Sequence, residues 1–187
     1  MNDFIKACNR LSPLDEVAAG ELLDKLKTRS LKKDQLLLSR GSVCNHLFFI
    51  DMGLTKTYFT TRDKEFIMRF FCEKEMFTVL DSFITQQPST YYIKALEASE
   101  VSYIEQKELE ELCRKHHCIE TFFRKLVSIA AVNMMKRISE MLEENASTRY
   151  AHFIKDNSSL LQRISLGDLA SYLGITQVSL SRIRSQK

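Results

Sequence analysis

LGDLASYLGITQVSLSRIRS, residues 166–185, has the pattern of two short helices that cross at a steep angle. The second helix can approach the first closely only over a small side chain, and Ala170 stands at that place. A left-handed turn between the helices favours glycine, which Gly174 supplies. The stretch therefore predicts a helix-turn-helix. The space between the two helices would be filled by apolar residues at the five expected positions, Leu169, Leu173, Ile175, Leu180 and Ile183.

Capping residues support both helices of this motif. Ser165 is a good N-cap for the first helix, with Asp168 at its third position, and Thr176 is a good N-cap for the second. A plain helical hairpin inside a domain is the alternative, but such a hairpin seldom combines all these positions with a basic outer face. We therefore predict that the second helix is a DNA recognition helix.

The outer face of the second helix carries side chains that suit bases and phosphates. Gln177 suits adenine, Arg182 suits guanine, and Val178 suits the methyl group of thymine. Ser179, Arg184 and Lys187 are better placed for phosphates. The residues predicted to contact double-stranded DNA are Thr176, Gln177, Val178, Ser179, Ser181, Arg182, Arg184 and Lys187.

The distribution of charge agrees with a polyanionic partner at this end. The chain of 187 residues has a net charge of +3. Residues 147–187 hold six basic and two acidic side chains, a net charge of +4, so the remainder is close to neutral. A basic C-terminal segment on a near-neutral body is typical of a nucleic-acid-binding protein.

The helix-turn-helix is preceded by a long segment without proline or glycine, residues 119–144. A helix of about 26 residues would be about 39 Å long, which exceeds a small domain and leaves a face for a partner. The sequence leaves two alternative contact faces on this helix. One runs through Leu126, Ile129, Asn133, Lys136 and Glu140, and the other runs through Phe122, Leu126, Ile129 and Val132. We predict a homodimer whose helix contacts include Phe122, Leu126, Ile129 and Asn133.

Short β-rich runs fill the middle of the chain, and helical patterns fill its beginning. Residues 3–30 have apolar side chains at helical spacing, with a second helix starting at Ser12-Pro13. From Leu31 to Ile104, runs such as HLFFI and EFIMRFF are separated by turn signals, and Phe66, Met68 and Phe70 alternate as in a half-buried strand. This pattern predicts an antiparallel sandwich or barrel.

The order of helices, strands, long helix and helix-turn-helix resembles the Crp/Fnr family of transcription regulators over nearly the whole chain. The resemblance is carried by RGSVCNHLFFIDMG, EFIMRFF, PSTYYIKALEASEVSYI, ELCRKHHCIETFFRKL, STRYAHFI and LASYLGITQVSLSRIR. It implies an α+β fold: an antiparallel β-roll of the double-stranded β-helix or jelly-roll type with flanking helices, a long dimerisation helix and a small winged-helix-like helix-turn-helix. RNA polymerase is a further partner implied by the resemblance.

Three parts are expected on this basis. Residues 1–118 would form the cyclic-nucleotide-binding-like β-roll with its N-terminal helices. Residues 119–145 would form the dimerisation helix, and residues 146–187 the DNA-binding domain. The chain stops four residues after Ile183, so we expect either no wing or only strands before the recognition helix, near residues 161–164.

The stretch EMFTVLDSFITQQPSTYY departs from the nucleotide-binding pattern of the family. Members that bind cyclic nucleotides have Gly-Glu where Thr78-Val79 stands, and Arg before a small residue where Ser89-Thr90 stands. Without the arginine, the charge-assisted bonds to a cyclic phosphate are lost. We expect an effector other than cyclic AMP, or none, and no cofactor. The predicted effector pocket comprises Thr78, Val79, Asp81, Ser82, Ser89 and Thr90.

Enzyme and metal chemistry find little support in the sequence. Cys113, His116, His117 and Cys118 form the single local Cys/His cluster, but adjacent histidines point in different directions and structural zinc sites draw ligands from separate segments. Cys8 alone lies where an iron-sulfur cluster would need several cysteines. A metal cupin would require a His-x-His pair that residues 31–104 lack, so we expect no catalytic residues and no metal.

The sequence also bears on location and on an alternative function. No apolar run approaches the roughly 18 residues of a membrane span, and the charged N-terminus is unlike a secretory signal, so we expect a cytoplasmic protein that does not contact membranes. Five scattered cysteines suit reduced thiols. The alternative function is a β-roll ligand sensor that acts mainly on a protein partner, with weak or vestigial DNA binding.

Overall fold

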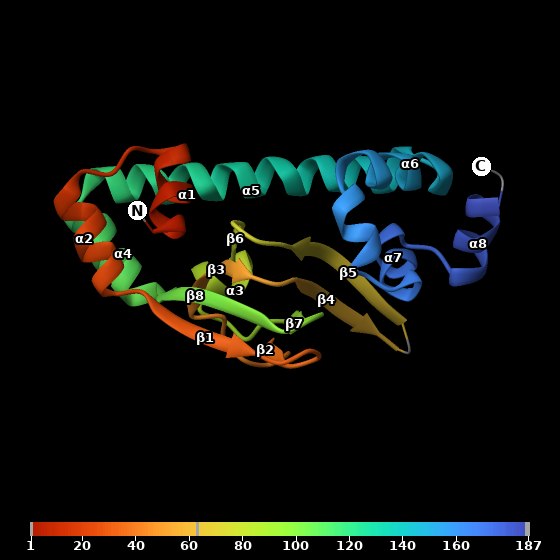
Figure 1. Cartoon of the computed structure of the whole chain (residues 1–187), viewed down its shortest axis with the longest axis horizontal. Helices are drawn as coiled ribbons and strands as arrows, with labels where there is room; N and C mark the ends of the chain where they lie inside the picture. Colours follow the sequence, from red (N-terminus) through yellow and green to blue (C-terminus); the bar gives the residue numbers. More distant parts are fainter. Residues whose placement is uncertain (1, 63, 186–187) are drawn as a thin grey trace.

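A computed structural model describes residues 2–62 and 64–185 of the chain (Figure 1). The helices are α1 (Asp3–Leu11), α2 (Glu16–Asp24), α3 (Leu80–Thr85), α4 (Gln106–Lys115), α5 (His117–Glu143), α6 (Ala146–Asp156), α7 (Leu166–Leu173) and α8 (Gln177–Ser185), with a 3-10 helix, η1 (Ser158–Gln162). The strands are β1 (Lys27–Leu31), β2 (Leu36–Leu38), β3 (His46–Met52), β4 (Thr55–Thr61), β5 (Lys64–Phe71), β6 (Met76–Phe77), β7 (Tyr92–Ala95) and β8 (Ser99–Glu105).

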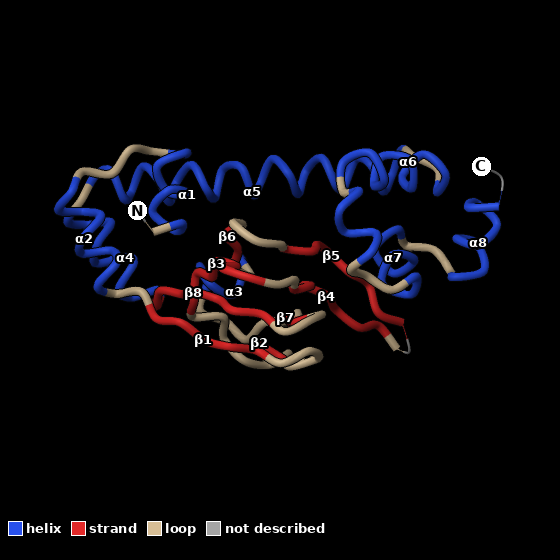
Figure 2. Tube along the Cα trace, in the orientation of Figure 1, coloured by secondary structure: helices blue, strands red, loops and turns tan. Residues whose placement is uncertain are grey.

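The strands form two four-stranded antiparallel sheets, in the orders β1-β8-β3-β6 and β2-β7-β4-β5. Alternate residues of both sheets point inward, and the apolar side chains between them include Phe48, Ile50, Phe71 and Ile93. The predicted α+β class with an antiparallel β-roll and a long helix is confirmed. Figure 2 shows the strands gathered on one side of α5, with helices at both ends.

The N-terminal segment differs in part from the prediction. Helix does not extend to residue 30, because β1 begins at Lys27 and pairs with β8. The second helix starts at Glu16 rather than Ser12, since the Asp15 side chain accepts a hydrogen bond of 2.8 Å from the Ala18 amide and caps it. Of the two alternatives for the wing, strands near residues 161–164 are not formed, because η1 covers residues 161 and 162 and the next two residues belong to no strand.

Helix α5 has two different halves. Its first part is anchored in a core with α1, β3 and α4, where Ile119 and Phe122 are fully buried. Beyond that core the helix runs alongside the β-roll to the C-terminal helices (Figure 1), and large apolar side chains are exposed on it. The 27 residues of α5 therefore join the β-roll to the C-terminal unit, which we define as α6, η1, α7 and α8.

The C-terminal unit packs on the β4–β5 hairpin through a shared apolar core. A β-bulge lies where Thr57 and Tyr58 face Arg69 and Ile67, so the strict alternation expected along β5 is broken. As a result Ile67 and Phe70 are both buried in the core that faces the C-terminal unit. The rings of Phe70, Phe153 and Tyr172, from β5, α6 and α7, lie within 5.1–6.3 Å of one another.

None of the described helices combines the length and the apolar character that a membrane-spanning helix requires.

Candidate nucleic-acid interface

Helices α7 and α8 form the helix-turn-helix that residues 166–185 predict. Ser165 and Asp168 cap α7 reciprocally, each side chain bonded to the other's backbone. Gly174 takes the left-handed conformation with φ of 69°, and a Cβ there would lie 2.8 Å from the Met141 methyl group. The left-handed backbone of this turn therefore favours glycine, whereas the contact with α5 involves only the flexible end of the Met141 side chain.

The face of α8 that points away from the protein carries the polar and basic residues predicted to contact DNA. Gln177, Ser181, Arg182 and Arg184 are exposed, and Val178 is 63% exposed. On the opposite face Leu180 is buried against α7, so the orientation of the helix is fixed by packing. The remaining predicted contacts are Thr176, exposed at the start of α8, Ser179, half-buried, and Lys187, which lies outside the described residues.

Thr176 holds the start of α8. Its hydroxyl oxygen accepts a hydrogen bond of 3.2 Å from the Ser179 amide and lies 3.0 Å from the Ser179 hydroxyl. This is the N-cap arrangement that the sequence predicts, and it leaves the first turn of α8 exposed to solvent. The amide dipoles of that turn favour an anion in front of it.

Two arginines from outside α7 bind its last carbonyl groups. Arg137 of α5 donates to the Tyr172 carbonyl oxygen, and its guanidinium lies 4.0 Å from the centre of the Tyr172 ring. Arg149 of α6 donates two hydrogen bonds, of 3.0 and 3.2 Å, to the Leu173 carbonyl oxygen. Cations at a helix C-terminus satisfy carbonyl groups that have no partner within the helix. The turn before α8 is therefore positioned by α5 and α6.

A buried lysine fixes α7 to the β-roll. Lys56 of β4 lies 2.7 Å from Asp168 and 2.5 Å from Glu65. Burial alone would lower the pKa of Lys56 and raise that of Asp168, but their hydrogen bonds outweigh burial in both cases. The pKa of Lys56 is therefore raised and that of Asp168 lowered. Both groups remain charged at neutral pH, and the pair sets the position of the first turn of α7.

Arg163 makes a second link between the two parts. Its guanidinium donates hydrogen bonds of 2.7 and 2.9 Å to the two carboxylate oxygens of Glu73, and one of 2.6 Å to Glu97. These contacts raise the pKa of Arg163, and the hydrogen bonds from Arg163 lower the pKa of Glu73 to about 2. The pair is bidentate and joins loops of the β-roll to the segment before α7.

We expect Glu73→Gln to lower the thermal unfolding midpoint by about 2–4 °C at pH 7, since a partly exposed ion pair contributes at most about 1 kcal/mol. The Glu73 carboxylate has a lower pKa in the folded chain than in the unfolded chain. Its contribution is therefore complete above about pH 4.5 and is lost as the pH falls towards 2. Circular dichroism melts from pH 7 to pH 2.5 should show the midpoints of variant and parent converging.

The matched control is Glu100→Gln on β8, whose side chain is exposed. This change should leave the midpoint close to that of the parent at every pH. If the difference in unfolding midpoint between Glu73→Gln and the parent stays constant down to pH 2.5, the ion pair with Arg163 does not stabilise the fold.

The exposed apolar surface of α5 overlaps the predicted dimer seams only at Ile129 and Val132, and Val132 is 64% exposed. Phe122, predicted to contact a partner, is fully buried in the chain's own core, and Leu126 is half-buried against it. Asn133 lies beside the β-roll, and Ile129 is 45% exposed. The prediction is wrong for Phe122, because this part of α5 packs on α1, β3 and α4.

A continuous row of exposed apolar residues runs along the other side of α5. Met135, Ile138 and Leu142 are 69%, 52% and 80% exposed, and Ala131 precedes them on the same side. Their spacing of four, three and four residues is the repeat found in helix-to-helix seams. We call Ala131, Met135, Ile138 and Leu142 the α5 stripe.

A cavity of about 580 Å³ lies between the β-roll and α5. Thr78, Val79 and Asp81 line it, as part of the predicted effector pocket. The other three predicted residues do not line it. The Ser82 hydroxyl is buried and donates to the Gln87 carbonyl at 2.6 Å, the Ser89 hydroxyl accepts from the Tyr91 amide at 2.9 Å, and Thr90 is exposed at the surface.

The lining of this cavity is mostly apolar, and α5 supplies a large share of it. Leu126, Val127, Ala130 and Ala131 form one wall, and Phe71 and Tyr91 are among the side chains opposite. We call this space the apolar cavity. Its polar side chains include Arg69, Asn133 and Arg137, which the sequence comparison with the nucleotide-binding pattern did not reveal.

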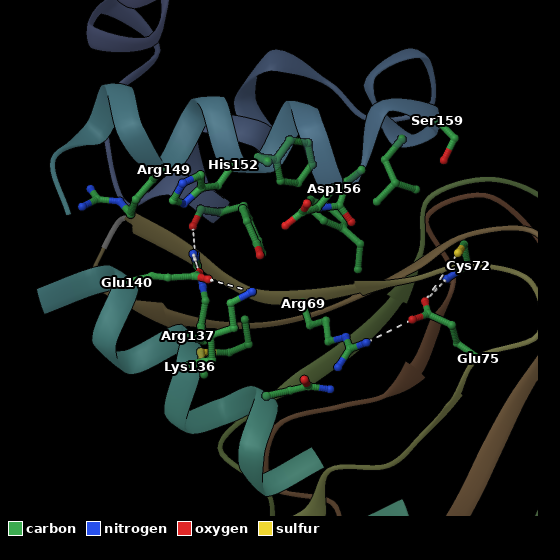
Figure 3. A pocket seen from close by; sticks show the side chains of 17 residues that line it. Arg69, Cys72, Glu75, Lys136, Arg137, Glu140, Arg149, His152, Asp156 and Ser159 are labelled. Carbon is green, nitrogen blue, oxygen red and sulfur yellow. Dashed lines mark hydrogen bonds and ion pairs between the residues drawn. The ribbon is translucent and has the colours of Figure 1, made fainter. Parts of the chain in front are cut away.

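A second, polar space of about 500 Å³ lies at the junction of β5, α5 and the C-terminal unit (Figure 3). Its charged side chains largely pair with one another: Arg69 with Glu75 at 3.0 Å, and Lys136 and Arg137 with Glu140 at 3.8 Å. We call it the junction cleft. It shares four lining residues with the apolar cavity, namely Met68, Arg69, Asn133 and Arg137.

The Cys/His cluster does not converge in the structure. His116 is 3.0 Å from Glu21, His117 is 91% exposed, and Cys118 contacts Asp15 at 3.5 Å. Cys113 packs against the core, and burial raises the pKa of its thiol to about 11. Within residues 2–62 and 64–185, no three side chains of the metal-binding types come together as a site.

The chain is similar to a known domain family and to several solved structures. Residues 28–116 match the family model of the cyclic nucleotide-binding domain. Among solved structures, FixK2 from Bradyrhizobium japonicum has a TM-score of 0.77 at 16% identity, over 86% of this chain and 83% of that one. A transcriptional regulator of the Crp/Fnr family from Eubacterium rectale has a TM-score of 0.76 at 16% identity, over 99% of this chain and 87% of that one.

A third similar structure is the c-di-GMP responsive global regulator CLP from Xanthomonas campestris. Its TM-score is 0.70 at 15% identity, over 92% of this chain and 91% of that one. No protein of the curated set matches the sequence. At these identities the likeness concerns the fold, which is that of the Crp/Fnr regulators.

Proposed function

We propose that this chain, which has a cyclic nucleotide-binding domain and the fold of the Crp/Fnr regulators, is a homodimeric transcription regulator that binds double-stranded DNA through α8. The observation that carries the proposal is the exposed face of α8. Gln177 and Arg182 are exposed on a helix whose other side is fixed by Leu180. Side chains of this kind bind base edges in the major groove. We also expect no enzymatic activity.

A second copy of the chain is the partner that the α5 stripe favours. Three large apolar side chains on an exposed helix, in the repeat of a helix seam, lose unfavourable contact with water when an identical helix covers them. A dimer built on this stripe would present two α8 helices. Their half-sites should lie about 34 Å apart on a pseudo-palindromic operator. RNA polymerase stays a partner implied by the resemblance alone.

We further propose that the effector is not cyclic AMP. The apolar cavity is lined by Thr78 and Val79, which stand where nucleotide-binding members have Gly-Glu, yet its walls are mainly hydrocarbon, and the arginine of the phosphate cassette is replaced by Ser89-Thr90. Ser89 is buried and bonded to Tyr91, so it does not reach the cavity. A cyclic phosphate would therefore lose its solvation without gaining charge-assisted hydrogen bonds from these residues.

The direct test of DNA binding is selection from a random duplex pool at low salt, followed by affinity measurements on the enriched sequence. We expect a pseudo-palindromic motif, and an affinity that falls steeply with salt, because phosphate contacts release counterions. Failure to enrich any motif would contradict the proposal. It would favour the alternative, a ligand sensor that acts on a protein partner.

Arg182→Ala should weaken binding to the selected duplex by about 1–3 kcal/mol and relax the preference at one base position per half-site, because a bidentate arginine distinguishes guanine from other bases. Fluorescence anisotropy on the selected duplex and on single-base variants measures both effects. Arg29→Ala is the matched control, an exposed arginine on β1, and it should leave affinity and preference unchanged. If the Arg182 variant and the parent show the same base preference at every position, Arg182 does not contact a base.

A further inference from the structure

The apolar cavity and the C-terminal unit meet at one side chain, Arg137. It lines both the apolar cavity and the junction cleft, and only 16% of its side chain is exposed. On the side of the C-terminal unit it donates to the Tyr172 carbonyl oxygen and stacks on the Tyr172 ring. A single guanidinium therefore touches the end of α7 and reaches the cavity.

The contacts of Tyr172 extend this connection to α8. Its ring lies 5.5 Å from that of Phe70 and 5.1 Å from that of Phe153, so a displaced ring would disturb the core under the C-terminal unit. Its carbonyl group is two residues before Gly174, the turn from which α8 departs. Packed cores respond to displacement by changing between discrete arrangements rather than by deforming gradually.

The polar side of the apolar cavity determines which ligand could act on Arg137. Arg69 and Arg137 both line this cavity, and each lies near a carboxylate, Glu75 at 3.0 Å and Glu140 at 3.8 Å. Each guanidinium has five N–H donors, and the hydrogen bonds to Glu75 and to the Tyr172 carbonyl oxygen use one donor each. Both groups therefore keep donors for an anion. The rest of the wall, with Phe71, Leu126, Val127 and Ala130, suits hydrocarbon.

We propose that Arg137 is a positioning residue that couples occupancy of the apolar cavity to the placement of α7 and α8, and that the cavity takes an apolar molecule with a single carboxylate group. The carboxylate binds Arg69 and Arg137 and competes with the Tyr172 carbonyl for the Arg137 guanidinium. The end of α7 then loses one of its two arginine contacts and α8 changes position. The proposal deepens the regulator function above and rests on it for its biological purpose.

The ligand class is tested by isothermal titration calorimetry of the whole chain with decanoate, 1-decanol and cyclic AMP. Decanoate should bind at least about tenfold more tightly than 1-decanol, because charge-assisted hydrogen bonds to arginine favour the carboxylate. Cyclic AMP should give no saturable heat. Equal binding of decanoate and 1-decanol, or no binding of either, would overturn the ligand class.

Coupling is tested with a fluorescent reporter at the contact itself. The chain has no tryptophan, so Tyr172→Trp places a single indole beside Arg137. Saturation with decanoate should shift the emission of that indole, since the guanidinium leaves its ring. Adding Arg137→Gln should abolish the shift while decanoate still saturates the cavity through Arg69. A shift that persists at saturation in the Arg137→Gln protein would overturn the coupling.

Two further variants separate coupling from binding and from folding. Arg69→Gln should weaken decanoate binding about tenfold but keep the full emission shift at saturation. Arg124→Gln, on the same helix with a 59% exposed side chain and lining neither space, should change neither the affinity for decanoate nor the emission shift. Thermal melts establish that each variant is folded. None of these measurements uses DNA, so they can refute the coupling while the selection experiment independently upholds or refutes DNA binding.

Discussion

Ile138→Glu is expected to abolish the proposed dimer and to reduce the affinity of the chain for a palindromic operator by at least about 100-fold. Ile138 is 52% exposed in the middle of the α5 stripe. In a dimer built on this stripe, two carboxylates would be buried in an apolar seam without partners, at a cost of several kcal/mol. Loss of the second recognition helix removes a gain in avidity of 10²–10⁴.

Sedimentation equilibrium and anisotropy on full and half operators measure the two effects together. The variant should bind a half-site about as well as the parent does, because α8 itself is unchanged. Lys136→Glu is the control, since it adds the same side chain about 160° further round the helix. If the dimer persists with Ile138→Glu but dissociates with Lys136→Glu, the interface does not lie on the α5 stripe.

Leu173→Ala is the second change with a large expected effect. Leu173 is fully buried where α7 packs on the β4–β5 hairpin and on α6. Truncation to alanine should lower the free energy of unfolding by about 2–5 kcal/mol, measured by urea titration of the circular dichroism signal. DNA binding should decline with temperature in step with the folded fraction, because the side chain lies on the inner side of the motif.

Leu166→Ala is the matched control on the same helix, since Leu166 is 52% exposed. It should change the free energy of unfolding by no more than about 0.5 kcal/mol. If Leu173→Ala weakens DNA binding equally at temperatures where the variant is fully folded, then Leu173 acts on the DNA-binding surface and not only on stability.

The helix-turn-helix could be predicted because its requirements are local. A small residue at Ala170, a left-handed glycine at Gly174 and a cap at Ser165 are read directly from twenty consecutive positions, and the structure confirms each of them. The strands of the β-roll were also predictable wherever β-branched and aromatic residues gather. Strand β1 was not, because four of its five residues are exposed and its partner β8 is seventy residues away.

The seam of α5 and the polar end of the cavity could not be predicted for a different reason. Phe122 and Ile138 are both apolar residues on one long helix, and only tertiary packing decides which is covered by the chain itself. Likewise Arg69 and Arg137 line one space because β5 and α5 lie beside each other in the fold. The pattern of residues in the sequence does not predict that these two arginines line the same space.

The apolar cavity adjoins the α5 stripe, since Ala131 and Met135 belong to both. A second copy seated on the stripe would also roof the cavity. Dimerisation and ligand binding would then be thermodynamically linked. Dilution would dissociate the dimer and weaken ligand binding, and added ligand would favour the dimer. A cell could thus silence such a regulator by lowering its copy number, with no change in the amount of the signal.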